Sequence, residues 1–211
     1  MRDSNGVTEL DPYWVNRMDA IYIQYAYFLA RVVGRDAQSV IDVGSKKCGY
    51  LDWMDWIPIK VSLDLRNPYR SPSVTGIKGD FLTTPLPQQF DLCLCLQVLE
   101  HVTDAHRFAR RLLETAPQLI ISVPYKWNAK WVDSHVHDPV DEEKIRTWFG
   151  RDPNNAYVVK EPFTKARRIV CYFDRDDPRR AISKDEIKQR RLYRPIVPPA
   201  RQAIPEWAVG S

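Results

Sequence analysis

Acidic or amide side chains end four short apolar runs in the first half of the sequence. Asp42, Asp64 and Asp80 end the first three runs, and Gln97 ends the fourth. Asp64 follows Asp42 by about twenty residues, the separation that one β-α-β unit creates, and a carboxylate there can accept hydrogen bonds from a ribose diol. The pattern therefore favours a ligand that contains a nucleoside.

Three histidines are candidates for proton transfer, because imidazole ionises near neutral pH and can accept a proton from a hydroxyl group. His101 follows the fourth apolar run, whereas His135 and His137 lie in a later segment flanked by aromatic residues. His101 could equally be a packing residue at the start of a helix, and the other two could be structural loop residues. Asp138 could join His135 and His137 as a metal ligand, but without a third convincing ligand we predict no metal site.

Strand-like and helix-like patterns alternate around these residues. The predicted strands span residues 39–44, 60–64, 76–80, 90–96 and 118–123. Helices are predicted at 50–56, 104–115 and 141–149, and an antiparallel hairpin at 156–161 and 167–174. Such alternation is typical of parallel strands with right-handed crossovers, so we predict an α/β fold: a Rossmann-like, doubly wound, mostly parallel sheet in a three-layer sandwich, finished by the hairpin.

The chain length of 211 residues suits one sheet domain with appendages. We assign residues 1–34 to an N-terminal helical segment and residues 35–175 to the sheet domain, with an insert at about 125–150. Residues 176–211 form a basic tail rich in proline and arginine, with a helix expected at about 183–193. Ligands of such sheets bind at the carboxyl ends of the strands, where the four acidic and amide residues are expected.

The order of motifs between Ser39 and Tyr125 resembles that of class I S-adenosylmethionine-dependent methyltransferases. The motifs are Val40-Ile41-Asp42-Val43-Gly44-Ser45, Leu63-Asp64, Gly79-Asp80, and Phe90-Asp91-Leu92 leading into Gln97-Val98-Leu99-Glu100-His101-Val102. Each motif alone is weak, and the ordered set carries the resemblance. It implies an enzyme that binds S-adenosylmethionine and methylates an oxygen or nitrogen of a small-molecule or sugar-like acceptor.

The resemblance also implies roles for individual residues. Asp42 and the turn that begins at Gly44 would hold the methionine end of the cofactor, Asp64 would bind the ribose hydroxyls, and Asp80 with Phe81 would frame the adenine. Ser45, Gly49, Leu65 and Gln97 complete the predicted cofactor-binding set. His137, His135 and His101 are the candidate catalytic residues. His135 and His137 lie in the segment after the fifth strand, which commonly covers the acceptor in related enzymes.

The first turn departs from the family pattern D-x-G-x-G-x-G, since Lys46 stands where the middle glycine is expected. Glycine permits a positive φ and a close approach of the backbone to a ligand, so we expect a rearranged loop shaped by Ser45 and Gly49. No G-x-G-x-x-G follows the first strand, which argues against a nicotinamide enzyme.

Composition bounds the location and the partners. The four cysteines lack zinc-knuckle or C-x-x-C spacing, the N-terminus leads into no apolar signal core, and no apolar stretch suffices to cross a bilayer. We therefore expect a cytoplasmic protein with no membrane partner. A net charge of +4 does not require nucleic acid. The basic tail is expected to be solvated or to wrap a second subunit of a homodimer.

Two other functions stay open from the sequence. Lys46 and the charged tail would suit a non-catalytic relative of the fold that acts as an interaction protein. A methyltransferase for protein or nucleic acid is the other alternative, for which salt-sensitive binding to RNA or DNA would be the sign.

Overall fold

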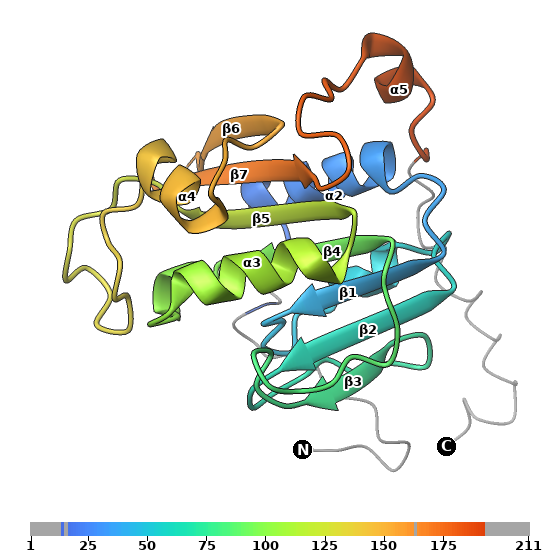
Figure 1. Ribbon diagram of the computed structural model, residues 1–211, viewed down its shortest axis with the longest axis horizontal. Helices are drawn as coiled ribbons and strands as arrows, with labels where there is room; N and C mark the ends of the chain where they lie inside the picture. Colours follow the sequence, from blue (N-terminus) through green and yellow to red (C-terminus); the bar gives the residue numbers. More distant parts are fainter. Residues whose placement is uncertain (1–13, 15–16, 163, 193–211) are drawn as a thin grey trace, which may run out of the picture.

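A computed structural model describes residue 14, residues 17–162 and residues 164–192 of the chain. Seven strands form one sheet in the order β3-β2-β1-β4-β5-β7-β6 (Figure 1). The strands are β1 (Ser39–Val43), β2 (Ile59–Asp64), β3 (Thr75–Lys78), β4 (Leu92–Leu96), β5 (Gln118–Pro124), β6 (Asn155–Lys160) and β7 (Arg167–Asp174). Strands β3, β2, β1, β4 and β5 are parallel, and β7 runs antiparallel to both β5 and β6. The predicted doubly wound α/β sheet with a C-terminal antiparallel hairpin is confirmed.

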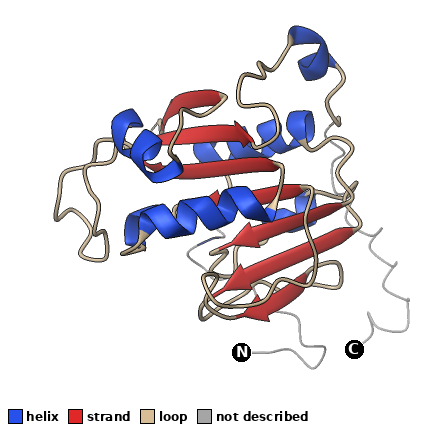
Figure 2. Cartoon of the chain, in the orientation of Figure 1, coloured by secondary structure: helices blue, strands red, loops and turns tan. Residues whose placement is uncertain are grey.

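Helices cover both faces of the sheet, which gives the predicted three layers. Figure 2 shows the helices α3 (Ala105–Thr115) and α4 (Glu142–Phe149) in front of the sheet and α2 (Ile21–Val33) behind it. The short 3-10 turn η1 (Tyr50–Trp53) packs on the same face as α2, and the turn η2 (Leu99–His101) follows β4.

Alternate residues of each strand enter two separate cores, as the period of two along a strand requires. Cys93 and Cys95 of β4 pack with α3 and α4, whereas Leu92, Leu94 and Leu96 pack with α2 and η1. All five residues are buried, so β4 is the centre of the molecule. Because both faces of β4 are packed in a core, the position of the loop at its carboxyl end is well defined.

One crossover of the sheet is shorter than the sequence pattern suggests. The helix predicted at 50–56 is only the turn η1, which ends at Trp53. The described chain has no helix between β2 and β3 or between β3 and β4. The second of these loops is instead held by Arg111 of α3, which donates to the carbonyl oxygens of Leu82 and Thr84 at 2.7 Å each.

The described part of the tail docks against α2. The helix predicted at about 183–193 is the shorter α5 (Lys184–Lys188), which begins with a capping box between Ser183 and Glu186 and buries no residue. Beyond it, Arg191 donates to the carbonyl oxygens of Arg31 and Arg35. Residues 1–13 and 193–211 lie outside the described residues. The second range holds most of the tail that was expected to wrap a second subunit. Among the described helices, none is long and apolar enough to cross a membrane.

Candidate functional site

The three strand-end acids lie at one edge of the sheet. Asp42 of β1 pairs with Ser62 of β2, and Asp64 at the end of β2 pairs with Lys78 of β3. Asp80 follows β3 by two residues. Strand β1 lies between β2 and β4, so the strand order reverses beside it, and this is where open α/β sheets bind their ligands.

Asp42 is a buried carboxyl group with an incomplete set of partners. It is 1% exposed, and the Tyr50 hydroxyl donates to Oδ1, while no described residue donates to Oδ2. Burial raises the pKa of Asp42 to about 7, against the opposing effect of the Tyr50 hydrogen bond and with a smaller contribution from the charge of Asp64. A cationic group placed against Oδ2 would compensate the buried charge.

The turn after β1 places two lysines in the left-handed region of backbone conformation. Gly44 has a φ of +86°, and a Cβ atom added there would lie 2.4 Å from Cγ2 of Val98. Lys46 and Lys47 adopt φ values of 44° and 65°, in the left-handed region that usually favours glycine. The backbone N–H of Lys46 donates to Asp64 Oδ2 at 3.0 Å, and its carbonyl oxygen accepts from the indole of Trp14 at 2.6 Å. These two bonds hold the turn on both sides.

Backbone N–H groups of the neighbouring loops take up most of the hydrogen-bonding capacity of Asp64. Its Oδ1 accepts from the backbone N–H groups of Arg66 and Asn67 at 2.8 and 2.7 Å, in addition to the Lys46 bond at Oδ2. A carboxylate oxygen accepts about two hydrogen bonds, so Oδ2 keeps room for one hydroxyl donor. Leu65 beside it is 59% exposed.

Asp80 and Phe81, which were predicted to frame the adenine, also have partners within the protein. Asp80 Oδ1 accepts from the backbone N–H of Leu82 at 2.9 Å. Phe81 is buried, with its ring centroid 4.8 Å from that of Phe108 and the guanidinium of Arg111 over its other side. The Phe81 ring therefore belongs to the core beneath α3, and its backbone is the part left for a ligand.

A small cavity opens between the ends of β1 and β4. Measured for the centre of a water-sized sphere, its volume is about 10 Å³, which is room for about one water molecule. The side chains of Trp14 and Tyr22 close it from the N-terminal side. The other lining residues are Ile23, Gly44, Ser45, Cys48, Tyr50 and Leu96. Gly49, also predicted as a cofactor contact, is the residue before η1 and directly precedes Tyr50.

Gln97, the last of the strand-end residues, links β4 to β7 and α2. It has a φ of 58°, donates to the Ser122 hydroxyl and accepts from Arg168 Nε at 3.0 Å. Arg168 also pairs with Glu161, whose carboxylate accepts from the first two backbone N–H groups of α2. Sequence reasoning missed Arg168 and Glu161, because they lie in the terminal hairpin, where no local motif points to the distant Gln97.

Two of the three candidate histidines meet at the end of β4. The rings of His101 and His135 lie edge to face, with their centroids 4.7 Å apart. His137 lies apart from them: its Nε2 is 2.8 Å from the carbonyl oxygen of Val102, and its ring packs against Trp148. Burial of part of the ring lowers the pKa of His101, and nearby His135 adds to this effect. The neutral imidazole therefore prevails at neutral pH.

Glu100 adds a buried acid beside this pair. It is 1% exposed, and burial raises its pKa to about 8. Glu100 was part of the V-L-E-H-V motif that carried the family resemblance, but it was not among the candidate site residues. The turn η2 places Glu100 inside the molecule, and the sequence alone does not show this.

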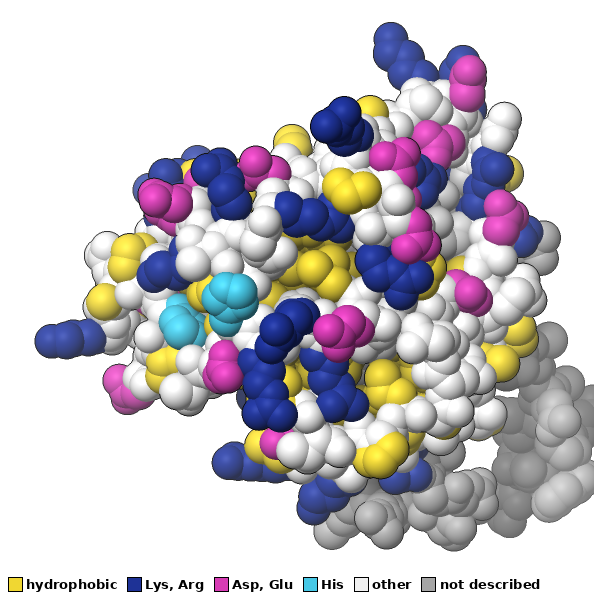
Figure 3. Space-filling model, viewed as in Figure 1, with side chains coloured by type: hydrophobic (Ala, Val, Ile, Leu, Met, Phe, Trp, Pro, Cys, Tyr) yellow, Lys and Arg dark blue, Asp and Glu magenta, His cyan; other side chains and the backbone are white. Residues whose placement is uncertain are grey.

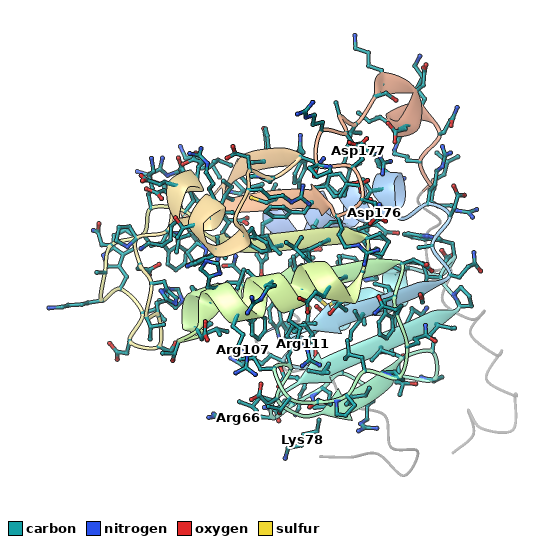
Figure 4. The ribbon with its side chains drawn as sticks, viewed as in Figure 1. Arg66, Lys78, Arg107, Arg111, Asp176 and Asp177 are labelled. Atoms are coloured by element: carbon teal, nitrogen blue, oxygen red, sulfur yellow. The ribbon has the colours of Figure 1, made fainter. Side chains whose placement is uncertain are left out.

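Cationic side chains gather on the same face of the molecule. Figure 4 shows Arg107 and Arg111 extending from α3 towards the ends of β2 and β3, where Arg66 and Lys78 lie. In the space-filling view, histidine side chains lie beside this group of lysine and arginine side chains (Figure 3). A concentration of like charge of this kind attracts anionic groups to the surface around the strand ends.

No protein-family model matches this sequence, and no curated protein sequence matches it significantly. Solved structures do share its fold. The N-methyltransferase NodS from Bradyrhizobium japonicum WM9, in complex with S-adenosyl-L-homocysteine, is 12% identical with a TM-score of 0.60 and covers 75% of this chain and 89% of its own. The 1,6-didemethyltoxoflavin-N1-methyltransferase from Burkholderia thailandensis, with bound 1,6-didemethyltoxoflavin and S-adenosylhomocysteine, is 18% identical with a TM-score of 0.57 and covers 75% and 79%.

A third structure is the S-adenosylmethionine-dependent methyltransferase from Mesorhizobium loti. It is 13% identical with a TM-score of 0.56 and covers 73% of this chain and 97% of its own. At these identities the likeness establishes a common fold.

Proposed function

We propose that this chain is an S-adenosylmethionine-dependent methyltransferase that acts on an oxygen or nitrogen of a small-molecule acceptor. The observation that carries the proposal is the buried Asp42 carboxyl group, whose Oδ2 lacks a hydrogen-bond donor among the described residues. It lies at the strand reversal of a sheet shared with enzymes solved with S-adenosylhomocysteine. The cofactor carries an ammonium group, the kind of cation that this buried carboxylate needs.

The chemistry of the surrounding residues fits the rest of the cofactor. The backbone of Gly44 and Ser45 borders the same cavity, Asp64 Oδ2 has room for one ribose hydroxyl, and the backbone near Asp80 and Phe81 lies at the next strand end. When bound, the cofactor supplies a methyl group already activated on a sulfonium. Trp14 and Tyr22 would have to move to admit it, and in their closed positions they would exclude water from the reacting atoms.

The acceptor is proposed to lie against His101 and His135. His101 follows β4 and His135 lies in the loop between β5 and α4, on the side of the strand reversal opposite to Asp64. A hydroxyl acceptor must lose its proton during the reaction, and these imidazoles are suitable polar groups for this task. We infer that His137, which the sequence also favoured, helps to position the loop through Val102 and Trp148.

Calorimetric titration of the full chain with S-adenosylhomocysteine tests the proposal. We expect one site per chain, and we expect Asp42→Asn to weaken the affinity at least ~10-fold, because it removes a charge that pairs with the ligand. Asp36→Asn is the matched control, because the Asp36 side chain is 77% exposed and lies in the loop before β1. Absence of binding to the wild-type chain, or equal weakening by both variants, would contradict the proposal.

A further inference from the structure

Three groups that can bind a metal ion come together beside the proposed acceptor position. Glu100, His101 and His135 each offer a ligand atom, and these atoms all lie within 4.8 Å of one another. Glu100 and His101 belong to η2, whereas His135 comes from the loop between β5 and α4. The backbone N–H of Val136 donates to the carbonyl oxygen of Glu100 at 2.9 Å, which holds the loop against η2.

The two imidazoles are oriented as metal ligands usually are. Nδ1 of His135 lies 2.6 Å from Asp138 Oδ2, and Nδ1 of His101 lies 2.9 Å from the carbonyl oxygen of Ser134. A hydrogen bond from one ring nitrogen to a carboxylate or a carbonyl oxygen leaves the other ring nitrogen with its lone pair exposed. Metal-binding histidines nearly always have such a partner, which fixes the ring and raises its basicity.

The carboxylate of the cluster needs a partner that no described side chain provides. Glu100 is 1% exposed, and its Oε2 is buried with no hydrogen-bond partner among the described residues. An unpaired buried carboxylate is costly, so such groups are found where a cation or a ligand compensates them. Asp138, the partner of His135, has a second oxygen in the same condition, which adds negative charge close to the cluster.

We propose that Glu100, His101 and His135 bind a divalent transition-metal cation, with Asp138 as the positioning residue of His135. Two imidazole ligands favour Zn²⁺ or Co²⁺ over Mg²⁺ and Ca²⁺, which prefer oxygen ligands. Ligand atoms at about 2.0–2.2 Å from a tetrahedral cation lie about 3.4 Å apart, so the cluster closes by about 1 Å or slightly more on binding.

Three protein ligands leave at least one coordination position open to a further oxygen. An acceptor hydroxyl bound there would have a lower pKa, because the cation stabilises the oxyanion. Its proton would pass to solvent water, since both imidazoles are then ligands of the cation. This consequence rests on the proposed methyltransferase function, whereas the binding of the cation itself does not.

The experiment is a titration of the chelator-treated full chain with Zn²⁺, Mn²⁺ and Mg²⁺ by calorimetry, with Co²⁺ absorption spectra as a report on the ligands. We expect one Zn²⁺ per chain and at least ~100-fold weaker binding of Mg²⁺. His135→Ala and His101→Ala should each weaken Zn²⁺ binding at least ~100-fold and alter the Co²⁺ spectrum. Glu100→Gln should weaken it while keeping the shape of the side chain, and Asp138→Asn should weaken it ~10–100-fold.

The matched control is His106→Ala, because His106 is an exposed histidine of α3 outside the cluster. Its Zn²⁺ affinity should equal that of the wild type. The proposal is overturned if the wild type binds none of these cations, if Mg²⁺ binds as tightly as Zn²⁺, or if His106→Ala loses as much affinity as His135→Ala. S-adenosylhomocysteine binding and far-ultraviolet circular dichroism of each variant report separately on the proposed function and on folding.

Discussion

At the scale of single residues, the site is marked by two acids whose burial is incompletely compensated. Asp42 and Glu100 are each 1% exposed, have pKa values raised to about 7 and about 8, and keep one oxygen without a donor in the described chain. Each therefore destabilises the fold when ionised. Perturbed acids of this kind gather at functional sites, where a ligand supplies the missing partner.

Asp42→Asn should change how stability depends on pH. The folded-state pKa of Asp42, about 7, exceeds the ordinary 3.8, so the folded chain binds more protons than the unfolded chain between these values. Its contribution to stability is therefore fully present below about pH 4 and is lost as the pH rises to about 7. Between pH 5 and pH 8.5, urea unfolding of the wild type should lose about 2–3 kcal/mol more than the variant does. Parallel pH profiles of the two proteins would contradict this.

Gly44→Ala should be much more harmful than the same change at Gly150. Both glycines have positive φ, +86° and +69°, but a Cβ at Gly44 meets Val98 at 2.4 Å, whereas nothing lies within 4 Å of one at Gly150. We expect about 1–2 kcal/mol for Gly150→Ala from the backbone alone and a total of about 3–4 kcal/mol for Gly44→Ala once the overlap is added. Chemical denaturation measures both, and Val98→Ala should restore part of the loss in the Gly44→Ala background.

The sequence located the strand-end residues because their place depends only on where each apolar run stops. It could not show that Asp64 is occupied by the amides of Lys46, Arg66 and Asn67, since these bonds depend on loop geometry. The sequence also could not show which histidines lie together. Their spacing of two residues favoured a pair of His135 and His137, whereas the fold brings His135 to His101.

At the scale of elements, the start of α2 is attached to the terminal hairpin through Glu161, which a buried ion pair with Arg168 holds in place. Glu161 accepts from the N–H groups that begin α2 and pairs with Arg168, whose guanidinium lies 4.6 Å from the ring centroid of Tyr22. Since Tyr22 lines the cavity at β1 and β4, the hairpin and the proposed site are connected through α2.

Glu161→Gln should destabilise the chain by about 3 kcal/mol, because it leaves a buried guanidinium without its charged partner. The side chains of Arg168 and Glu161 are only 9% and 11% exposed. Asp152→Asn is the control, since it breaks the exposed pair with Arg146 and should leave stability nearly unchanged. Urea unfolding at neutral pH measures both variants. An equal loss of stability in the two variants would contradict a larger contribution of the buried pair than of the exposed one.

The element pattern was predictable where apolar periodicity was strong. All seven strands and helices α3 and α4 lie within one or two residues of their expected positions, whereas the helix expected at 50–56 is only the turn η1. The loops before and after β3 contain Pro68, Pro72, Pro85 and Pro87. Their backbone is fixed by turns and by contacts with Arg111, for which the sequence carries no periodic pattern.

At the scale of the whole molecule, the sheet and its two cores carry the candidate site, and the tail is attached to one side. Arg180 forms ion pairs with both Asp174 of β7 and Glu186 of α5, and the side chain of Asn154 donates to the carbonyl oxygens of Asp177 and Arg180. An enzyme of the proposed kind does not need α5 for cofactor binding, whereas a protein that binds partners through its tail would.

Deleting residues 183–211 should leave the response to S-adenosylhomocysteine intact, because Arg180 and its bond to Asp174 remain. At 100 times the dissociation constant the ligand stabilises a protein by about 2.7 kcal/mol. For a chain of this size that raises the melting temperature by about 5–10 °C. Thermal unfolding of the full chain and of the truncated chain should show the same shift. A shift lost on truncation would favour a function that resides in the tail.

The indole of Trp14, hydrogen-bonded to the Lys46 carbonyl oxygen over a cavity that holds about one water molecule, has a kinetic consequence. Under the proposed function, a nucleoside-sized ligand enters only while the rings of Trp14 and Tyr22, which both line this cavity, are displaced. In stopped-flow mixing, the observed association rate should therefore level off at high ligand concentration, at the rate of ring opening. Trp14→Ala should raise this plateau, because only Tyr22 then has to move.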